Sequence, residues 1–183
     1  MTRIPYKLIR SNRRTMSIQI MPDGGVVVRA PSSVSTEAID AFVNQKEAWI
    51  RAHLAKVTSR PPQPRLSMEE IHALADQAME FIPRRVAHFA PKVGVTYNSI
   101  TIRNQRSRWG SCSGKGNLNF NCLLMLCPPE VIDYVVVHEL CHRKQMNHSA
   151  RFWAEVARIL PNYRQQEQWL DDNGTAIMTR MTG

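Results

Sequence analysis

The 183-residue sequence lacks any apolar run near the ~20 residues that a membrane-spanning helix requires. Its first seven residues lack the apolar core of a signal peptide. None of its four cysteines belongs to a C-x-x-C pair, which argues against a separate structural zinc site. The sequence also has no internal repeat and no low-complexity tract. We therefore expect a cytoplasmic protein without a disulfide framework and without a membrane partner.

Positive charge is present in excess and is unevenly spread. The net charge is +9, and residues 1–65 hold eleven Lys and Arg against four Asp and Glu, whereas residues 66–183 hold thirteen against eleven. A basic N-terminal region favours an anionic partner such as a nucleic acid, a nucleotide or an acidic protein segment. A solvated basic surface is the simpler explanation of the charge alone. Nucleic acid is thus a candidate partner of the N-terminal region.

One motif carries most of the functional information. His138, Glu139 and His142 form an H-E-x-x-H pattern, and His148 follows six residues later. On an α-helix, residues i and i+4 lie on the same face, so His138 and His142 can point at one ion. Glu139 can then reach a water molecule on that ion. A catalytic zinc has three protein ligands and one open position, and His148 is the candidate third ligand. The pattern predicts a zinc hydrolase.

The surrounding sequence supports the metal interpretation. Residues 128–130 begin a helix with two prolines and an acid, and residues 131–137 are apolar almost all round, which predicts a buried helix. Two histidines and a glutamate on a buried helix are costly unless a partner satisfies them. In the alternative, the histidines bond to backbone and Glu139 pairs with Arg143, but a third histidine then has no role. Cys141 is interpreted as a small buried residue.

Patterns along the chain predict an α+β fold in several parts. Three short strands before residue 30 are expected to form antiparallel β-hairpins, and Ser35 is expected to begin one helix running to about Leu54. A long helix is expected from a capping box at Ser67 to about residue 89. Short strands are expected at residues 93–97, 100–103 and 118–123, with a candidate glycine-rich turn before the last one, and the final helix is expected to end at Asn173–Gly174. Phe152 and Trp153 are predicted core residues. The predicted parts are the hairpin and helix region at 1–58, a proline-rich connector at 59–66, a metal-hydrolase core at 67–174 and a tail at 175–183.

Several of these segments together resemble one family. The sequences at 108–112 (R-W-G-S-C), 137–142 (V-H-E-L-C-H), 147–149 (N-H-S) and 152–153 (F-W) are similar to those of YgjP-like metallopeptidases, a zincin-type group related to SprT-like and WLM proteases. The resemblance covers nearly the whole chain. It implies a zincin-like core with a small antiparallel sheet and an active-site helix. It also implies zinc held by the residues matching His138, His142 and His148, with Glu139 as the base.

The sequence leaves the substrate open among three hypotheses. The motif and the resemblance favour a metallopeptidase. The resemblance also carries a nucleoside triphosphate pyrophosphatase activity, such as UTP to UMP and pyrophosphate. A cluster of cations near the motif, made of Arg103, Arg106, Arg108 and Lys115, supports this alternative, because arginine matches phosphate oxygens. We take Arg106 and Arg108 as candidate substrate-binding residues; a solvated loop would explain the cluster equally well. The third hypothesis is a nucleic-acid-associated, SprT-like protease. The physiological metal and the oligomeric state also stay open.

Overall fold

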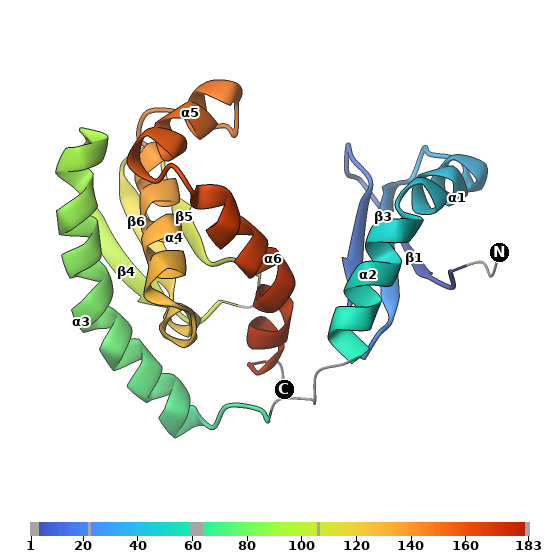
Figure 1. Cartoon of the computed structure of the whole chain (residues 1–183), viewed down its shortest axis with the longest axis horizontal. Helices are drawn as coiled ribbons and strands as arrows, with labels where there is room; N and C mark the ends of the chain where they lie inside the picture. The colour runs from blue at the N-terminus through green and yellow to red at the C-terminus, as the bar shows by residue number, and fades with distance from the viewer. Residues whose placement is uncertain (1–3, 22, 59–63, 106, 182–183) are drawn as a thin grey trace. The chain divides into compact units, whose positions relative to one another are not determined.

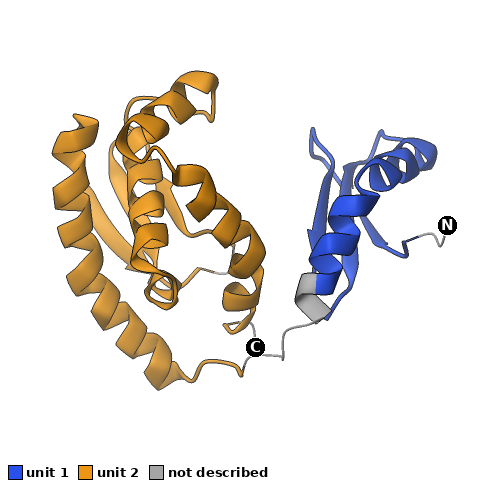
Figure 2. Cartoon of the chain, viewed as in Figure 1, with its two compact units in different colours: residues 1–63 blue, residues 64–183 orange. Residues whose placement is uncertain are grey.

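The chain forms two compact units, residues 1–63 and residues 64–183 (Figure 2). The computed structural model describes residues 4–21, 23–58, 64–105 and 107–181. Each unit combines helices with a three-stranded sheet, which confirms the predicted α+β class (Figure 1). The predicted connector falls mainly on residues 59–63, which lie outside the described residues.

Unit 1 consists of a small sheet and two helices that share one apolar core. The core contains alternate residues of the third strand, Val26, Val28 and Ala30, together with aliphatic residues of both helices. Its elements are β1 (Lys7–Ser11), β2 (Ser17–Ile20), β3 (Val26–Pro31), α1 (Thr36–Gln45) and α2 (Glu47–Thr58).

Two features of unit 1 differ from the sequence prediction. Strands β2 and β3 form the expected hairpin, but β1 pairs with β3 in parallel, in the order β1-β3-β2, and not with β2. The pairing of β1 is a long-range choice that a local turn pattern does not encode. The expected single helix from Ser35 is divided at Lys46 into α1 and α2, where no glycine or proline marks the break.

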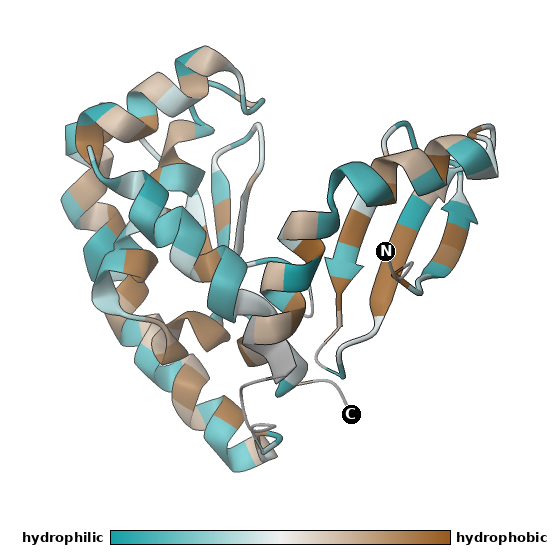
Figure 3. Cartoon of the chain, turned by 45° about the vertical axis from the view of Figure 1, so that its right-hand side comes forward, coloured by the Kyte–Doolittle hydropathy of each residue, from teal (hydrophilic) through white to brown (hydrophobic). Residues whose placement is uncertain are grey.

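Unit 2 is larger and is arranged around one central helix. That helix, α4, contacts α3, α5, α6 and β5, and it contributes more buried residues than any other described helix. The helices of unit 2 carry both hydrophilic and hydrophobic residues along their length (Figure 3). The elements are α3 (Met68–Val93), β4 (Ser99–Arg103), β5 (Gly110–Cys112), β6 (Asn117–Asn121), a 3₁₀ helix (Cys122–Leu126), α4 (Pro129–Cys141), α5 (Ala150–Ile159) and α6 (Tyr163–Thr179).

Helix α3 begins as predicted and ends later than predicted. The side chains of Ser67 and Glu70 form the expected capping box. The helix continues past Pro91 and ends at Gly94, whose φ of 78° lies in the left-handed region. It therefore includes Val93, where a strand was expected. Arg158 donates to the carbonyl oxygens of Lys92 and Val93, so a partner from α5 satisfies the last turn.

The sheet of unit 2 is mixed, with the order β4-β6-β5. Strands β5 and β6 are antiparallel and joined by the predicted glycine-rich turn, whereas β4 runs parallel to β6. The small sheet is therefore only partly antiparallel. Helix α6 continues through Gly174 to Thr179, so the predicted end at Asn173–Gly174 is wrong, and part of the predicted tail is helical. In the described part of the chain, no helix combines the length and apolar character needed to cross a bilayer.

Candidate metal centre

Helix α4 holds the H-E-x-x-H motif in a fixed place. Pro128 caps the helix and Pro129 occupies its first turn, as predicted. Arg85 of α3 makes a two-pronged ion pair with Asp133, with N···O distances of 2.6 and 2.7 Å. The segment from Val135 to Val137 is buried on all sides. These contacts therefore fix the position of the last turn of the helix, which carries the motif.

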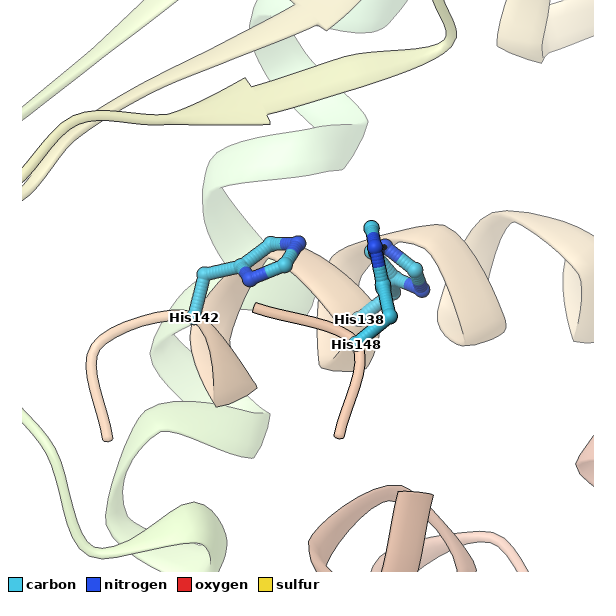
Figure 4. A group of neighbouring side chains, drawn as sticks. All are labelled: His138, His142 and His148. Carbon is cyan, nitrogen blue, oxygen red and sulfur yellow. Dashed lines mark hydrogen bonds between the residues drawn. The ribbon is translucent and has the colours of Figure 1, made fainter. Parts of the chain in front are cut away.

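The three histidines come together at the C-terminal end of α4. One nitrogen of each ring lies within 4.8 Å of the others, and Nε2 of His138 lies 3.0 Å from Nε2 of His148 (Figure 4). His142 is buried and donates from Nδ1 to the carbonyl oxygen of Gln145 at 3.0 Å. That bond fixes the His142 ring and leaves its Nε2 free to bind a metal.

Two aromatic rings of α5, those of Phe152 and Trp153, pack against the histidines. Phe152 is fully buried, and its ring centre lies 4.8, 4.6 and 4.9 Å from those of His138, His142 and His148. Trp153 stacks on His148 at 5.7 Å. The apolar spacing along α5 predicts both aromatics as core residues but does not predict these contacts. The signal available was their place on the first turns of α5, directly after His148.

Burial keeps His138 and His142 in the neutral form that binds metals. Burial, together with smaller effects of the nearby His142 and His148 rings, lowers the pKa of His138 to about 3. Burial also lowers the pKa of His142, against the opposing effect of its bond to Gln145. Neutral imidazole is the ligand form, so both groups are ready to bind a cation at neutral pH.

Glu139 is buried beside His138 on the last turn of the helix. Its side chain is 5% exposed, and burial raises the pKa of its carboxyl to about 8, partly opposed by the positive charge of Arg108. Oε2 of Glu139 and Nδ1 of His138 are buried, and neither has a hydrogen-bond partner among the described residues. Orphaned buried polar atoms are costly. A bound cation with its water would supply the missing partner of Glu139, so the residues present fit a metal site.

The predicted substrate-binding arginines have different outcomes. Arg108 is exposed and close enough to Glu139 for its charge to act on that carboxyl. Arg106 lies outside the described residues. Of the other cations considered, Arg103 donates to Asn119 Oδ1 at 2.9 Å on the sheet, and Lys115 is exposed in the β5–β6 turn. Cys141 is fully buried and does not belong to the histidine group, as predicted.

Comparison with protein families gives a match over most of the sequence. The family described as YgjP-like, metallopeptidase domain, matches residues 14–76 and 71–173. The chain belongs to the YgjP-like family. This confirms the resemblance that the motifs indicated, and the YgjP-like match includes all three histidines and Glu139.

Two solved structures are similar to about half of the chain. One is the metallopeptidase zymogen of Pyrococcus abyssi abylysin, at 23% identity and a TM-score of 0.46, covering 49% of this chain and 91% of that one. The other is the metallopeptidase zymogen of Methanocaldococcus jannaschii jannalysin, at 20% identity and a TM-score of 0.46, covering 51% and 97%. The search of curated proteins gave no match for this YgjP-like chain.

Proposed function

We propose that this protein is a zinc-dependent metallopeptidase in which His138, His142 and His148 hold the ion and Glu139 is the general base. The observation that carries the proposal is the meeting of three histidine nitrogens beside a buried carboxylate that lacks a partner. The family match to a metallopeptidase domain supports the reaction class. Three imidazoles with one open position are the donor set of a catalytic zinc rather than of a closed structural site.

The chain's own residues account for the proton transfers of peptide hydrolysis. When bound, zinc would polarise the scissile carbonyl and make a water molecule acidic at neutral pH. Glu139 would take the proton of the attacking water on its carboxylate and deliver it to the departing amine nitrogen. A carboxyl whose pKa is raised by burial, as that of Glu139 is, suits a group that must both accept and return a proton near neutral pH.

The test is to incubate the zinc-loaded full chain with an unfolded protein and a peptide mixture, and to identify the products by mass. Glu139→Gln is the matched control, because the amide is nearly isosteric and cannot accept a proton. We expect new peptide termini with the parent and none with the control. A fully zinc-loaded parent that cleaves no peptide would contradict the proposal.

The nucleotide alternative is tested in the same experiment. Its support in the described residues is Arg108, an exposed guanidinium whose charge acts at the site. Nucleoside triphosphates, UTP among them, are added to the substrate panel. Release of pyrophosphate by the parent without any peptide cleavage would replace the peptidase proposal with the pyrophosphatase one.

Unit 1 supports a nucleic-acid partner by the placement of its charges. Because Val26, Val28 and Ala30 face the core, Arg29 lies on the opposite face of the sheet, where it is exposed beside Ser17. Arg13 donates to Ser17 Oγ at 3.0 Å, and the exposed Lys7 lies on the same face of β1. The acidic residues in the described part of unit 1 all lie outside these strands, at Asp23, Glu37, Asp40 and Glu47.

This cationic face is expected to bind phosphate backbones in a salt-dependent way. Replacing Lys7, Arg13 and Arg29 with Gln should lower the affinity for DNA or RNA and reduce the slope of log affinity against log salt by about three. The matched control replaces Lys46, Arg51 and Arg84, three cations outside the sheet of unit 1, with Gln. Equal effects of the two triple variants would exclude a specific role of the face.

The four cysteines are free, which supports the predicted cytoplasmic location.

A further inference from the structure

Edge strand β5 lies against the carboxylate of Glu139 at a residue without a side chain. A Cβ atom placed on Gly110 would lie 2.7 Å from both Cγ and Oε1 of Glu139 and 2.9 Å from its Cδ. We propose that Gly110 is a positioning residue for Glu139: its missing side chain lets the strand lie against the carboxylate and set where that carboxylate stands. The inference rests on the proposed role of Glu139 as general base.

Space, and not backbone conformation, explains the glycine at this position. Among the described glycines, a positive φ occurs at Gly24, Gly94 and Gly116, and Gly110 is not one of them. Any residue type can therefore adopt the backbone of Gly110. The three atoms nearest to an added Cβ all belong to Glu139, at distances that real Cβ contacts do not show. A side chain at position 110 is thus excluded by the carboxylate of Glu139 itself.

The strand cannot move away to make room. Gly110 is opposite the fully buried Phe120 in the β5–β6 pairing. The next residue of β6, Asn121, is 1% exposed and donates from its backbone N–H to the carbonyl oxygen of Trp109 at 2.8 Å. Its side-chain amide donates to the carbonyl oxygens of Gln105 and Arg108 at 2.7 and 2.9 Å. Asn121 therefore holds Gln105, Arg108 and Trp109, which precede β5.

A second close approach holds Trp109, the residue before Gly110. A Cβ atom on Gly174 of α6 would lie 3.2 Å from Cζ2 and 3.3 Å from Nε1 of Trp109, so the indole lies directly on the helix backbone. Trp109 and Gly110 together thus contact both β6 and α6, and Glu139 of α4 lies against Gly110. Among these contacts, the Glu139 side chain is the part that can move, because its Oε2 has no hydrogen-bond partner among the described residues.

A methyl group at position 110 would therefore move the carboxylate and leave the fold in place. The carboxylate must shift by several tenths of an ångström to reach ordinary contact distance. Misplacement of a reacting group by about 1 Å can cost on the order of 100-fold in rate. The three atoms nearest to that methyl include none from His138, His142 or His148, so metal binding should be unaffected.

The first test compares Gly110→Ala with Gly114→Ala. Gly114 lies in the β5–β6 turn, where an added Cβ meets nothing within 4 Å, so it is the matched control. On cleaved peptides, Gly110→Ala should lower kcat by about 100-fold with little change in KM and with full zinc content. Gly114→Ala should behave as the parent does. A parental kcat in Gly110→Ala would overturn the proposal.

The second test needs no activity and separates the contact from the proposed function. In metal-free protein, Gly110→Ala should lower the melting temperature by a few degrees. In the Glu139→Ala background, where the contacted atoms are gone, the same substitution should cause no further loss. If Gly110→Ala does not fold, the double variant should restore folding. Equal losses in both backgrounds would overturn the inference. If the parent cleaves no peptide but this coupling is found, the peptidase proposal fails while the positioning contact stands.

Discussion

The two halves of the candidate metal centre are built in different ways. His138, Glu139 and His142 lie on a buried helix that packs against neighbours on every side, whereas His148 is exposed on the turn between α4 and α5. Trp153 stacks on His148, Tyr163 stacks on Trp153, and Tyr134 of α4 stacks on Tyr163. The exposed ligand is therefore tied back to the helix of the other ligands by a row of rings. The helix half is fixed by burial, and the turn half is fixed by stacking.

The largest effect is expected from removing the proton-accepting carboxylate of the helix half. Glu139→Gln should reduce peptide cleavage by ~10²–10⁴-fold, because the amide cannot take the proton of water. Zinc content should stay at that of the parent, since the three histidines are untouched. Turnover and metal analysis on the same preparation check both statements. Parental turnover in this variant would remove Glu139 from the role of base.

Removal of one ligand from each half should separate metal binding from stability. His142→Ala and His148→Ala should each weaken zinc binding by more than about 100-fold, beyond the usual cost of losing an outer partner. Only His142→Ala should also lower the melting temperature of the metal-free protein, because only that ring is buried. The exposed His72→Ala serves as control in chelator competition and thermal unfolding. Full, tight occupancy in His148→Ala would show that the turn supplies no ligand.

The buried carboxyl of the helix half should make the metal-free protein less stable as the pH rises. The pKa of Glu139 is about 8 in the folded chain against an ordinary value of 4.5, so the folded state holds a proton that the unfolded state has lost. Stability therefore falls with rising pH across this window. Between pH 6.5 and pH 8, the parent should lose about 2 kcal/mol relative to Glu139→Gln, a comparison in which the titration of the histidines cancels. Urea unfolding at both pH values measures the free energies. An equal change with pH in the parent and in Glu139→Gln would contradict this.

The smallest effect is expected from loosening the turn half. Trp153→Leu removes the ring that stacks on His148, and zinc affinity should fall by about tenfold, as for other supporting groups around a metal. Trp49→Leu, which alters an exposed tryptophan of unit 1, is the matched control. Competition with a chelator measures both. An unchanged affinity in Trp153→Leu would mean that the turn backbone alone positions His148.

The helix half of the site was predictable from sequence because its geometry is local. The i, i+4 spacing of His138 and His142 and the apolar run before them already define a buried helix with two ligands on one face. The capping box at Ser67 and the β5–β6 turn are local in the same sense. The contacts of Phe152 and Trp153 with the histidines, and the approach of Gly110 to Glu139, join segments far apart in the chain. No periodicity records which distant side chain fills a given space, and the parallel pairing of β1 was missed for the same reason.

The two ends of unit 2 meet each other. The N–H of Leu66 donates to the carbonyl oxygen of Arg180 at 2.9 Å, and Nε of Arg180 donates to the carbonyl oxygen of Pro64 at 3.1 Å. A unit whose first and last residues are hydrogen-bonded to each other can have these ends joined by a short linker, and new termini can be made in another loop. The exposed β5–β6 turn offers such a place for new termini. The connectivity of unit 2 therefore suits circular permutation, or insertion of the unit into a surface loop of another protein.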